Sequence, residues 1–479
     1  MKFRVILGVI SLVSCFRVQG QDLWDLRRCV EYALANNLSV RKAYIDAQDG
    51  KYVLQQSQYN QIPSFSVSTN YGLNAGRSID PTTNQFTIQQ LNFAGLNVQS
   101  GVTLFNWFGL RNEIAGRRLD VEVALESITK LKNDISLNVA SGYLLVLLAQ
   151  EQANIAQVAV NLSLQNLDNT QKRVDAGTLP ELNLAEIEAQ LARDSASLVS
   201  AKSTVQQNVL ALKALLNLDA ASDFTVALPP VDEIRVQSLQ ELEPDLVYQL
   251  ALANLPQQRI NDLRIKAAGK YAQASKAQLL PTISVFGSLA TNYTNNSRAT
   301  YSFIPTGVYK PTGAIVSVGG TNYDVLTPEI KNVVSTYIPS FSTQMSDNFR
   351  QNIGLGLSLP IWNNGRARIG WQRNKLAVKS MELQKEQGER TLKQDIYQAY
   401  NNAVASVQKY QASLKTVQTA EKAYSFAQKR YELGLLSTID FLTNQNNLTR
   451  AKVERVLNQV DYVFRLKVLE FYKGQGLTF

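Results

Sequence analysis

The two halves of this chain repeat one pattern, and this duplication limits the possible folds more than any other feature of the sequence. The segment Gln171–Gly177 (QKRVDAG) recurs in the second half as Gln428–Gly434 (QKRYELG). Upstream, Ile62–Val67 (IPSFSV) recurs at a shorter offset as Leu280–Val285 (LPTISV), so the second copy holds 39 additional residues between the two blocks. Each copy is far longer than the ~20 to 50 residues of a solenoid repeat. The sequence therefore predicts a pseudo-symmetric fold built from two large repeats.

The composition argues against most enzyme classes. The chain has no histidine, which is the usual general base near neutral pH and the commonest metal ligand. Its two cysteines, Cys15 and Cys29, cannot form a zinc cluster. The net charge of +9 is not gathered into a basic cluster with interleaved aromatic residues, so a nucleic-acid partner is not expected. We expect neither a catalytic site nor a bound metal or cofactor.

The N-terminus has the pattern of an export signal. Basic residues precede the apolar run Val5–Val13, and small and polar residues follow up to Gly20, after which cleavage is expected. Leu12–Cys15 (LVSC) also fits a lipobox, which would make Cys15 a lipidation site, but the charged Arg17 that follows favours simple cleavage. No later segment has the ~18 unbroken apolar residues of a membrane helix. If the chain spans a membrane, strands must do it.

Proline placement permits very long helices. No proline lies between Pro81 and Pro180, and none follows Pro360. Small and apolar residues recur every three or four positions through the first stretch, and the equivalent positions of the second copy repeat this spacing. The pattern is typical of a heptad-type seam between packed helices. The seam residues are Ala149, Ala153, Ala156, Val160, Ser163, Leu167, Thr170 and Val174, with Ser406, Tyr410, Ser413, Val417, Ala420, Tyr424, Ala427 and Tyr431 in the second copy. A second apolar stripe beside the seam predicts a neighbour on each side, as in a ring of helices; a single two-stranded coiled coil is the alternative.

Each long helix is expected to turn and return. A helix from about Gly109 to Ala176 would be roughly 100 Å long. It would turn at Gly177–Pro180, where glycine suits a helix C-terminus and proline a first helical turn, and the return helix would end near Leu218. The second copy would turn at Gly434–Ser437 and return to about Tyr472.

Four segments change to a period of two, which is typical of strands. They lie near residues 65–73, 96–104, 283–289 and 353–359, and each has around ten residues, enough for a tilted strand to cross hydrocarbon. The alternate face is Ser, Gly, Asn and Thr, almost without charge, which favours a transmembrane barrel over a soluble sheet with one buried face. Four strands cannot close a barrel, and lipid does not tolerate open edges. Three copies would give twelve strands and a lumen, whereas two copies would give eight and a filled interior. The loop from Tyr293 to about Asn352 holds the insertion and is expected on the outer surface.

This ordered set of features resembles the TolC family of outer-membrane efflux channels, over essentially the whole mature chain. The resemblance is carried by the repeat, by Trp24–Leu26 leading into Val30–Asn37, by Pro360–Trp362 before Gly365, and by the two turns. It implies a homotrimer with a twelve-strand barrel in outer-membrane lipid and a tunnel of helices across the periplasm. It also implies a passive conduit that works with a periplasmic adaptor and an inner-membrane transporter.

We therefore expect an α+β membrane protein with a long antiparallel α-helical barrel and a transmembrane β-barrel, four strands per chain, formed by a trimer. The expected segments are the signal peptide (1–20), the periplasmic helical parts (21–62, 107–280 and 361–479, with a connecting segment near 219–244), the barrel strands with extracellular loops (63–106 and 281–360), and the two repeats (about 22–218 and 244–472).

The resemblance also implies two kinds of site. The helix-hairpin tips would dock the adaptor through Gly177, Thr178 and Leu179 in the first copy and Gly434, Leu435 and Leu436 in the second. The periplasmic aperture would be narrowed at Asp440, whose first-copy equivalent is Asn183. Structural roles are equally open: the glycines as helix C-caps, and Asp440 as a carboxylate favoured by a helix N-terminus.

Two other classes of protein compete with the channel. A secreted coiled-coil scaffold or a periplasmic adaptor-like protein would also carry long helical hairpins. Adaptors, however, lack two paired sets of ten-residue alternating strands. An enzyme would need a cluster of reactive groups that the sequence does not offer.

Overall fold

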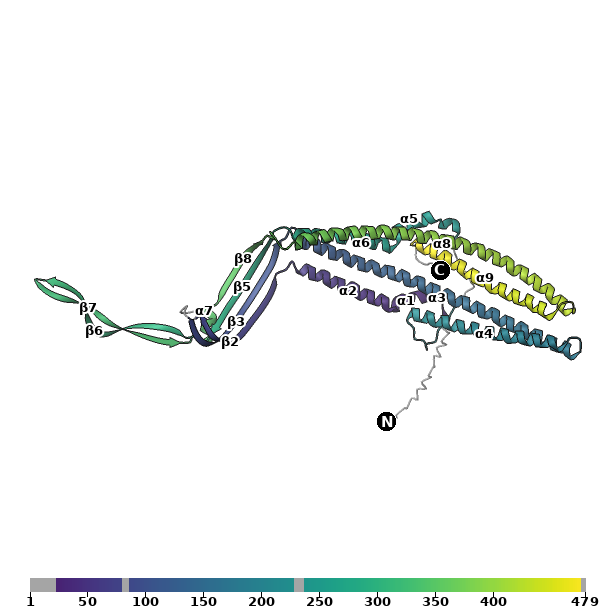
Figure 1. Ribbon diagram of the computed structural model, residues 1–479, viewed down its shortest axis with the longest axis horizontal. Helices are drawn as coiled ribbons and strands as arrows, with labels where there is room; N and C mark the ends of the chain where they lie inside the picture. Colours follow the sequence, from purple (N-terminus) through teal and green to yellow (C-terminus); the bar gives the residue numbers. More distant parts are fainter. Residues whose placement is uncertain (1–22, 80–85, 228–236, 475–479) are drawn as a thin grey trace, which may run out of the picture. The chain divides into compact units, whose positions relative to one another are not determined.

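The structure is a computed structural model that describes residues 23–79, 86–227 and 237–474 (Figure 1). The expected signal peptide and Cys15 lie outside the described residues. The chain divides into two compact units. One, the helical unit, comprises residues 1–52, 117–268 and 376–479; the other, the strand unit, comprises residues 53–116 and 269–375.

The helices confirm the duplication at the level of single residues. Helices α1 (Leu26–Asn36) and α2 (Leu38–Tyr59) return as α5 (Pro244–Asn254) and α6 (Pro256–Ala277), with both ends of each at the offset that separates Ile62 from Leu280. The long helix α3 (Gly109–Asp175) returns as α8 (Arg366–Glu432), with both ends at the offset that separates Gly177 from Gly434. The return helices α4 (Glu181–Leu216) and α9 (Thr438–Tyr472) begin at that same offset. The predicted long helices, turns and return helices are therefore confirmed.

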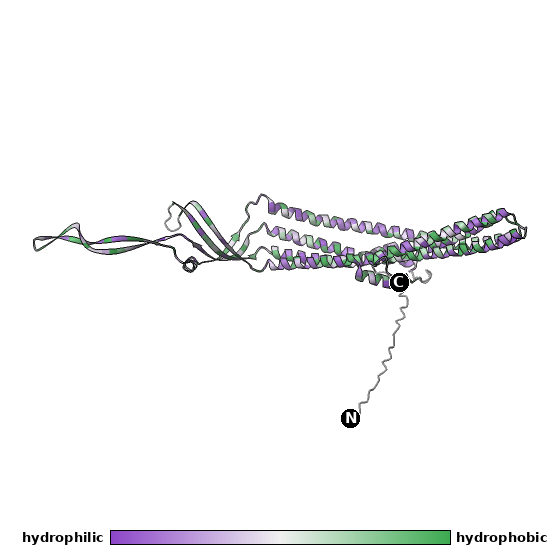
Figure 2. Cartoon of the chain, turned by 90° about the horizontal axis from the view of Figure 1, so that it is seen from below, coloured by the Kyte–Doolittle hydropathy of each residue, from purple (hydrophilic) through white to green (hydrophobic). Residues whose placement is uncertain are grey.

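The predicted seam is the buried side of the long helices. Ala149, Ser163 and Thr170 of α3 are each at most 2% exposed, and Ser406 and Val417 of α8 are likewise buried. The second stripe beside the seam is not covered in this way. This stripe consists of Ile155, Val158 and Leu162; Val158 is 61% exposed in the single chain, and the other two are half-buried. Among the described residues, no helix is long and apolar enough to cross a membrane, and hydrophilic and hydrophobic residues interleave along the helices (Figure 2).

The core of the helical unit lies where the short helices pack against the long ones. Cys29 of α1 is fully buried among residues of α3 and α4, and Val247 of α5 is fully buried against α8 and α9. The segment that connects the copies contributes a short strand, β4 (Thr225–Val226), parallel to β1 (Leu23–Trp24), and a 3₁₀ turn, η2 (Leu239–Leu242). Burial stabilises both packing sites by about 25 cal/mol per Å² of apolar surface.

The strand unit contains the four predicted strands in one antiparallel sheet, in the order β2-β3-β5-β8. Their bounds are Ser64–Ile79 (β2), Phe86–Phe105 (β3), Thr282–Thr294 (β5) and Arg350–Ser358 (β8). The register places the apolar residues of neighbouring strands in common rows, for example Val102 opposite Val285 and Val285 opposite Leu355. Side chains alternate between the faces of a strand, so the sheet has one largely apolar face and one polar face, on which Arg350 of β8 is a charged residue.

Phe286 breaks the alternation of β5, and the register explains why it is tolerated. It stands on the polar face opposite Gly101 on one side and Gly354 on the other. A Cβ atom at Gly354 would lie 2.7 Å from the Phe286 ring, so the ring fills the space that the glycine leaves open. Phe93 covers Gly72 in the same manner.

The segment Tyr293 to Asn352, expected to be a loop, is a β-hairpin followed by a short helix. The hairpin strands are β6 (Arg298–Val318) and β7 (Thr321–Tyr337), and they form a two-stranded sheet of their own, here called the ribbon. Helix α7 (Phe341–Asp347) follows. Prolines within both strands conceal the strand pattern, because proline normally indicates a break in a sheet.

Two turns lead from a strand into a long helix, and both use left-handed backbone. Trp107 and Phe108 precede α3 with φ of 53° and 62°, and Asn364 and Gly365 precede α8 with φ of 55° and 75°. Asn and Gly tolerate this region, whereas for a bulky residue it costs about 1–2 kcal/mol. In the first copy the Trp107 and Phe108 rings pack on Phe105, with centroids 5.3 and 5.8 Å away, and this contact offsets part of the strain.

Candidate functional site

Both helix-hairpin tips are built as the same C-terminal turn. In the first, the Gly177 N–H donates to the Val174 carbonyl (2.8 Å) and the Thr178 N–H to the Arg173 carbonyl (2.9 Å). In the second, Gly434 and Leu435 donate to the equivalent carbonyls at 3.0 and 2.8 Å. This is the Schellman pattern, which satisfies the last carbonyls of a helix.

The glycines are required for backbone conformation, not for space. Gly177 and Gly434 have φ of +67° and +74°, and a Cβ atom at either position would meet nothing within 4 Å. A bulky residue there would strain the turn as well as alter its surface. The glycines therefore have a structural role, and a test of docking has to change the side chains beside them.

The two tips present different surfaces. Leu435 of the second tip is 63% exposed, and Leu433 and Ile439 beside it are also exposed. The position equivalent to Leu435 in the first tip is Thr178, whose hydroxyl donates to the Arg173 carbonyl. Large exposed apolar residues that cluster often mark an interaction site, so the second tip is the more apolar candidate.

The remaining tip residues expected at the docking site are partly buried. Leu436 packs against the cluster of Ile187, Phe441 and Leu442, and Leu179 is half-buried. The Tyr431 and Phe441 rings of this cluster stack with centroids 4.5 Å apart. Leu436 therefore packs inside the second hairpin and holds the exposed residues of its tip in place.

Asp440 and Asn183, equivalent in the two copies, make different contacts. Asp440 is exposed in the first turn of α9, where Ser437 is the N-cap residue: the Asp440 N–H donates to the Ser437 hydroxyl, which donates back to the carboxylate at 2.7 Å. Asn183 is half-buried and donates from Nδ2 to the Thr438 hydroxyl of the second hairpin. The structure thus brings Asn183 to the second hairpin and leaves the Asp440 carboxylate at the surface.

A buried polar network, which sequence reasoning missed, joins the two hairpins. Gln445 of α9 donates to Ser163 (3.1 Å) and accepts from Asn166 (3.0 Å), both on α3. Gln190 of α4 donates to Asn446 of α9 at 3.0 Å. Gln190 and Gln445 are each 2% exposed. The polar residues Ser163 and Thr170 within the otherwise apolar seam indicate that buried hydrogen bonds are needed there, but nothing local in the sequence identifies their partners.

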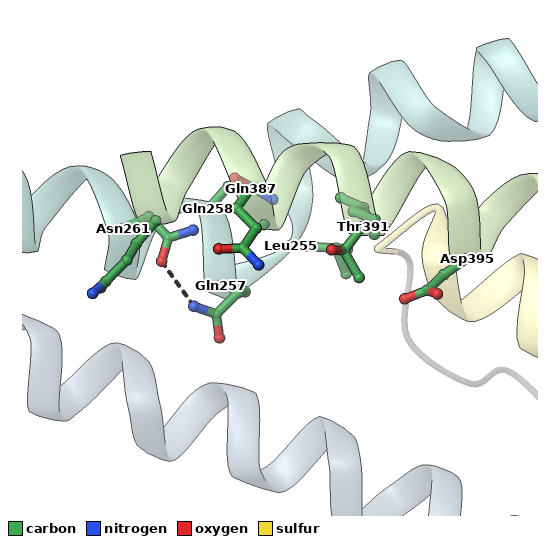
Figure 3. Close-up of a pocket in the computed structure, with 10 residues that line it drawn as sticks. Leu255, Gln257, Gln258, Asn261, Gln387, Thr391 and Asp395 are labelled. Atoms are coloured by element: carbon green, nitrogen blue, oxygen red, sulfur yellow. Dashed lines mark hydrogen bonds between the residues drawn. The ribbon is translucent and has the colours of Figure 1, made fainter. Parts of the chain in front are cut away.

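A polar cavity of about 400 Å³ lies between α6 and α8 in the helical unit (Figure 3). Its wall is dominated by amides, among them Gln257, which donates to Asn261 at 2.9 Å, and Gln258, which is buried. Asp395 is its one carboxylate. The described residues contain no group of three or more His, Cys, Asp or Glu side chains that could hold a metal. A cavity lined mainly by amides can hold ordered water.

Known proteins are similar in sequence to this chain across both of its repeats. The outer membrane efflux protein family matches residues 29–218 and 247–474, one match for each repeat. The outer membrane efflux protein BepC of Brucella suis is 20% identical over 433 residues, which cover 90% of this chain and 81% of that protein. The outer membrane protein TolC of Escherichia coli is 21% identical over 446 residues, which cover 92% of this chain and 80% of that protein.

Solved structures share the fold. The CmeC outer membrane channel of Campylobacter jejuni superposes with a TM-score of 0.74 at 16% identity, covering 94% of this chain and 86% of that one. The outer membrane protein VceC of Vibrio cholerae gives a TM-score of 0.71 at 16% identity, covering 95% and 97%. Since the family matches both repeats and most of the chain, the protein belongs to the outer membrane efflux protein family and is an outer-membrane efflux channel.

Proposed function

We propose that three copies of this chain close one twelve-strand barrel in the outer membrane and form the passive exit of a tripartite efflux system. Channels of the family are trimeric and work with an adaptor and an inner-membrane pump. The observation that carries the proposal for this chain is the sheet, whose outer strands β2 and β8 each have one unpaired edge. Lipid does not tolerate such edges, so they must pair.

The strand directions support closure by further copies. All three pairings within the sheet are antiparallel, so β2 and β8, at its two edges, run in opposite directions. Strand β8 of one copy can therefore pair with β2 of the next in the same antiparallel manner. The apolar face, with Val67, Leu355 and Leu357 each at least 69% exposed in the single chain, would then face lipid around the whole barrel.

In this arrangement residues 63–106 and 281–360 supply the barrel and the parts outside the membrane, and the helical segments lie in the periplasm. The tips at Gly177–Leu179 and Gly434–Leu436 would dock the adaptor, with the exposed Leu435 as the main apolar contact. Asp440 would place one ring of three carboxylates near the periplasmic aperture. Asn183 would add no charge to that ring because a carboxamide is neutral, and its amide donates to Thr438 of the second hairpin.

The stoichiometry of the purified complex tests this proposal. Light scattering in detergent, corrected for bound detergent, should give three times the mass of the mature chain. A stable two-chain complex would contradict the proposal, because eight strands make a barrel whose interior side chains fill. A dispersed monomer would contradict it as well, since it leaves both sheet edges open.

A further inference from the structure

The insertion that distinguishes the second copy is the β6–β7 ribbon, and its surface is unusual. The ribbon forms a sheet of its own, and Tyr301, Phe303, Tyr309 and Ile330 on it are each at least 52% exposed in the single chain. A two-stranded ribbon by itself is marginally stable in water. Its exposed aromatic and branched residues therefore need a covering partner.

Two Pro-Thr-Gly triplets, residues 305–307 and 311–313, shape the ribbon. At each triplet β6 gains two residues relative to β7, which is a bulge. The glycines have φ of +77° and +76°, and the threonine hydroxyls donate to β7 carbonyls at 3.1 and 2.8 Å. Because each bulge adds an even number of residues, side chains keep alternating between the same two faces across it.

Between its root and the second bulge, the ribbon therefore has one face without charged residues, here called the apolar face, and one that carries all the charges, here called the charged face. The charged face also carries Ile304, Val333 and Tyr337. The apolar face is defined by Tyr301, Phe303, Tyr309, Leu326, Ile330 and Val334, which the register places on one side. The charged residues of this section, Arg298, Lys310, Glu329 and Lys331, all fall on the other side, where Lys310 and Glu329 form an ion pair. Beyond the second bulge the apolar residues Val316 and Tyr323 lie on the opposite face.

The edges of the ribbon are poorly suited to pairing with another strand. Pro305 and Pro311 lie in β6 and Pro328 in β7. Proline has no N–H, so a strand laid along either edge would find a donor missing. Bulges disturb edge pairing further. The partner is therefore expected to pack on the face of the ribbon and not to extend it as a third strand.

The root of the ribbon is fixed to the sheet. Asn295 exchanges hydrogen bonds with Asn92 of β3: its side chain accepts at 2.7 Å and its N–H donates at 3.1 Å. Gln344 of α7 is 3% exposed and bonds to both the N–H and the carbonyl of Thr294 at the end of β5. Each ribbon thus starts from a defined place beside β5 and β8.

Resting on the proposed trimer, this root places three ribbons on one rim. Twelve strands spaced ~4.8 Å apart and tilted by ~40° make a barrel of roughly 12 Å radius, so the roots stand roughly 20 Å apart. The section of the ribbon that carries the apolar face has about eleven residues in β7 and is about 36 Å long. This length exceeds the distance between the roots, so each ribbon can contact the ribbons of the other two copies. Tethering at this distance gives an effective concentration in the millimolar range or above, which favours a copy over a freely diffusing partner.

We propose that the apolar faces of the three ribbons pack against one another outside the membrane and form a collar around the channel exit. The interaction surface is the apolar face defined above, and the partner is a second copy of this chain. The charged face points to water, where Lys310, Glu329 and Lys331 remain solvated.

Single cysteines on the two faces test the collar. Cys29 gives little background, because it is fully buried and burial raises the pKa of its thiol to about 12. Phe303→Cys lies on the apolar face, and its matched control Ser302→Cys lies next to it on the charged face. A second pair nearer the root, Ala299→Cys and Thr300→Cys, leaves the large apolar residues in place.

In intact trimers, mild oxidation should link F303C and A299C into covalent dimers, and S302C and T300C should stay monomeric. Each trimer holds three such thiols and can therefore form at most one disulfide, so the linked fraction should level off near two thirds of the chains. A water-soluble maleimide should label F303C roughly tenfold more slowly than S302C. Intact trimers in which both faces label equally and neither variant links would overturn the collar while leaving the channel standing. Loss of the trimer in the unmodified protein, measured by light scattering, would instead refute the proposed function.

Discussion

Leu435→Asp is expected to abolish efflux while leaving the trimer in the outer membrane. Leu435 is 63% exposed at the second tip, and it contributes to the turn only backbone groups that aspartate also supplies: an N–H that donates to the Arg430 carbonyl and a carbonyl that accepts from the Arg430 guanidinium. Folding should therefore be affected by less than about 0.5 kcal/mol, as for other exposed positions. A buried charge in the docked state would cost at least about 2 kcal/mol per site, which is roughly a thirtyfold loss of adaptor affinity. Drug susceptibility of cells and adaptor capture by the purified trimer measure the effect.

Two matched variants show whether the effect belongs to the docking surface. Val199→Asp places the same charge on α4, at a residue that is 69% exposed in the single chain. It should leave efflux unchanged if assembly, checked by light scattering, is intact. Thr178→Asp alters the equivalent position of the first tip, which is already polar, and should give a smaller loss than Leu435→Asp. Equal efflux in L435D and the unmodified protein would refute a docking role for the second tip.

Lys467→Met is expected to destabilise the end of α9 by about 3–5 kcal/mol, the usual effect of removing one member of a buried ion pair. Lys467 and Glu470 are each 4% exposed, and their charged groups lie 2.8 Å apart. Glu470 also accepts the Gln237 N–H at 2.8 Å, so the pair anchors the segment that connects the two copies. The substitution leaves a buried carboxylate without this cation.

Amide hydrogen exchange in the last turns of α9 measures this loss locally. K467M should accelerate exchange by about two to four orders of magnitude. Arg465→Met is the matched control: its ion pair with Asp461 on the same helix is about 40% exposed and should contribute less than about 0.5 kcal/mol. The double variant K467M/E470L should recover most of the stability. Equal exchange in K467M and R465M would show that burial of the pair does not matter.

Much of the fold could be predicted because the informative residues are local. Proline-free stretches, the glycines at 177 and 434, and the seam residues predict the C-terminal ends of α3, α4, α8 and α9 to within about two residues. Because the chain is duplicated, each of these sequence patterns occurs twice, and the second occurrence supports the prediction made from the first. Alternation alone predicted the four sheet strands, and their register confirms a shared apolar face. Their expected length of around ten residues was wrong for β2, which has 16 residues, and for β3, which has 20.

The features that were not predicted depend on contacts between distant residues or on unusual backbone. The sequence predicts a loop for the ribbon, because Pro305, Pro311 and Pro328 look like breaks until the Pro-Thr-Gly bulges are seen. The left-handed Trp107 and Phe108 are bulky residues for which no local pattern predicts positive φ. The network around Gln445 joins parts of the chain that are far apart in sequence, which no local periodicity reports.

At the candidate site, too, contacts between distant residues could not be predicted from the sequence, as Asn183 and Asp440 show. Their alignment by the repeat is correct, but the copies use the position differently. Asn183 bonds to the neighbouring hairpin, whereas Asp440 bonds to Ser437, the N-cap residue of its own helix. Three-dimensional contacts therefore distinguish an amide that holds the neighbouring hairpin from an exposed carboxylate that bonds only within its own helix start.

Ion conductance of the purified trimer in planar lipid bilayers tests the central claim most directly. The channel should give discrete single-channel openings, and Asp440→Ala should raise their frequency or size by removing three carboxylates from the aperture. Asp440→Asn is the matched control, because an amide oxygen can still accept from the Ser437 hydroxyl while the charge is lost. Similar increases in D440A and D440N would assign the effect to charge; an increase in D440A alone would assign it to the cap. Folded, inserted trimers that conduct in none of the three forms would contradict the account.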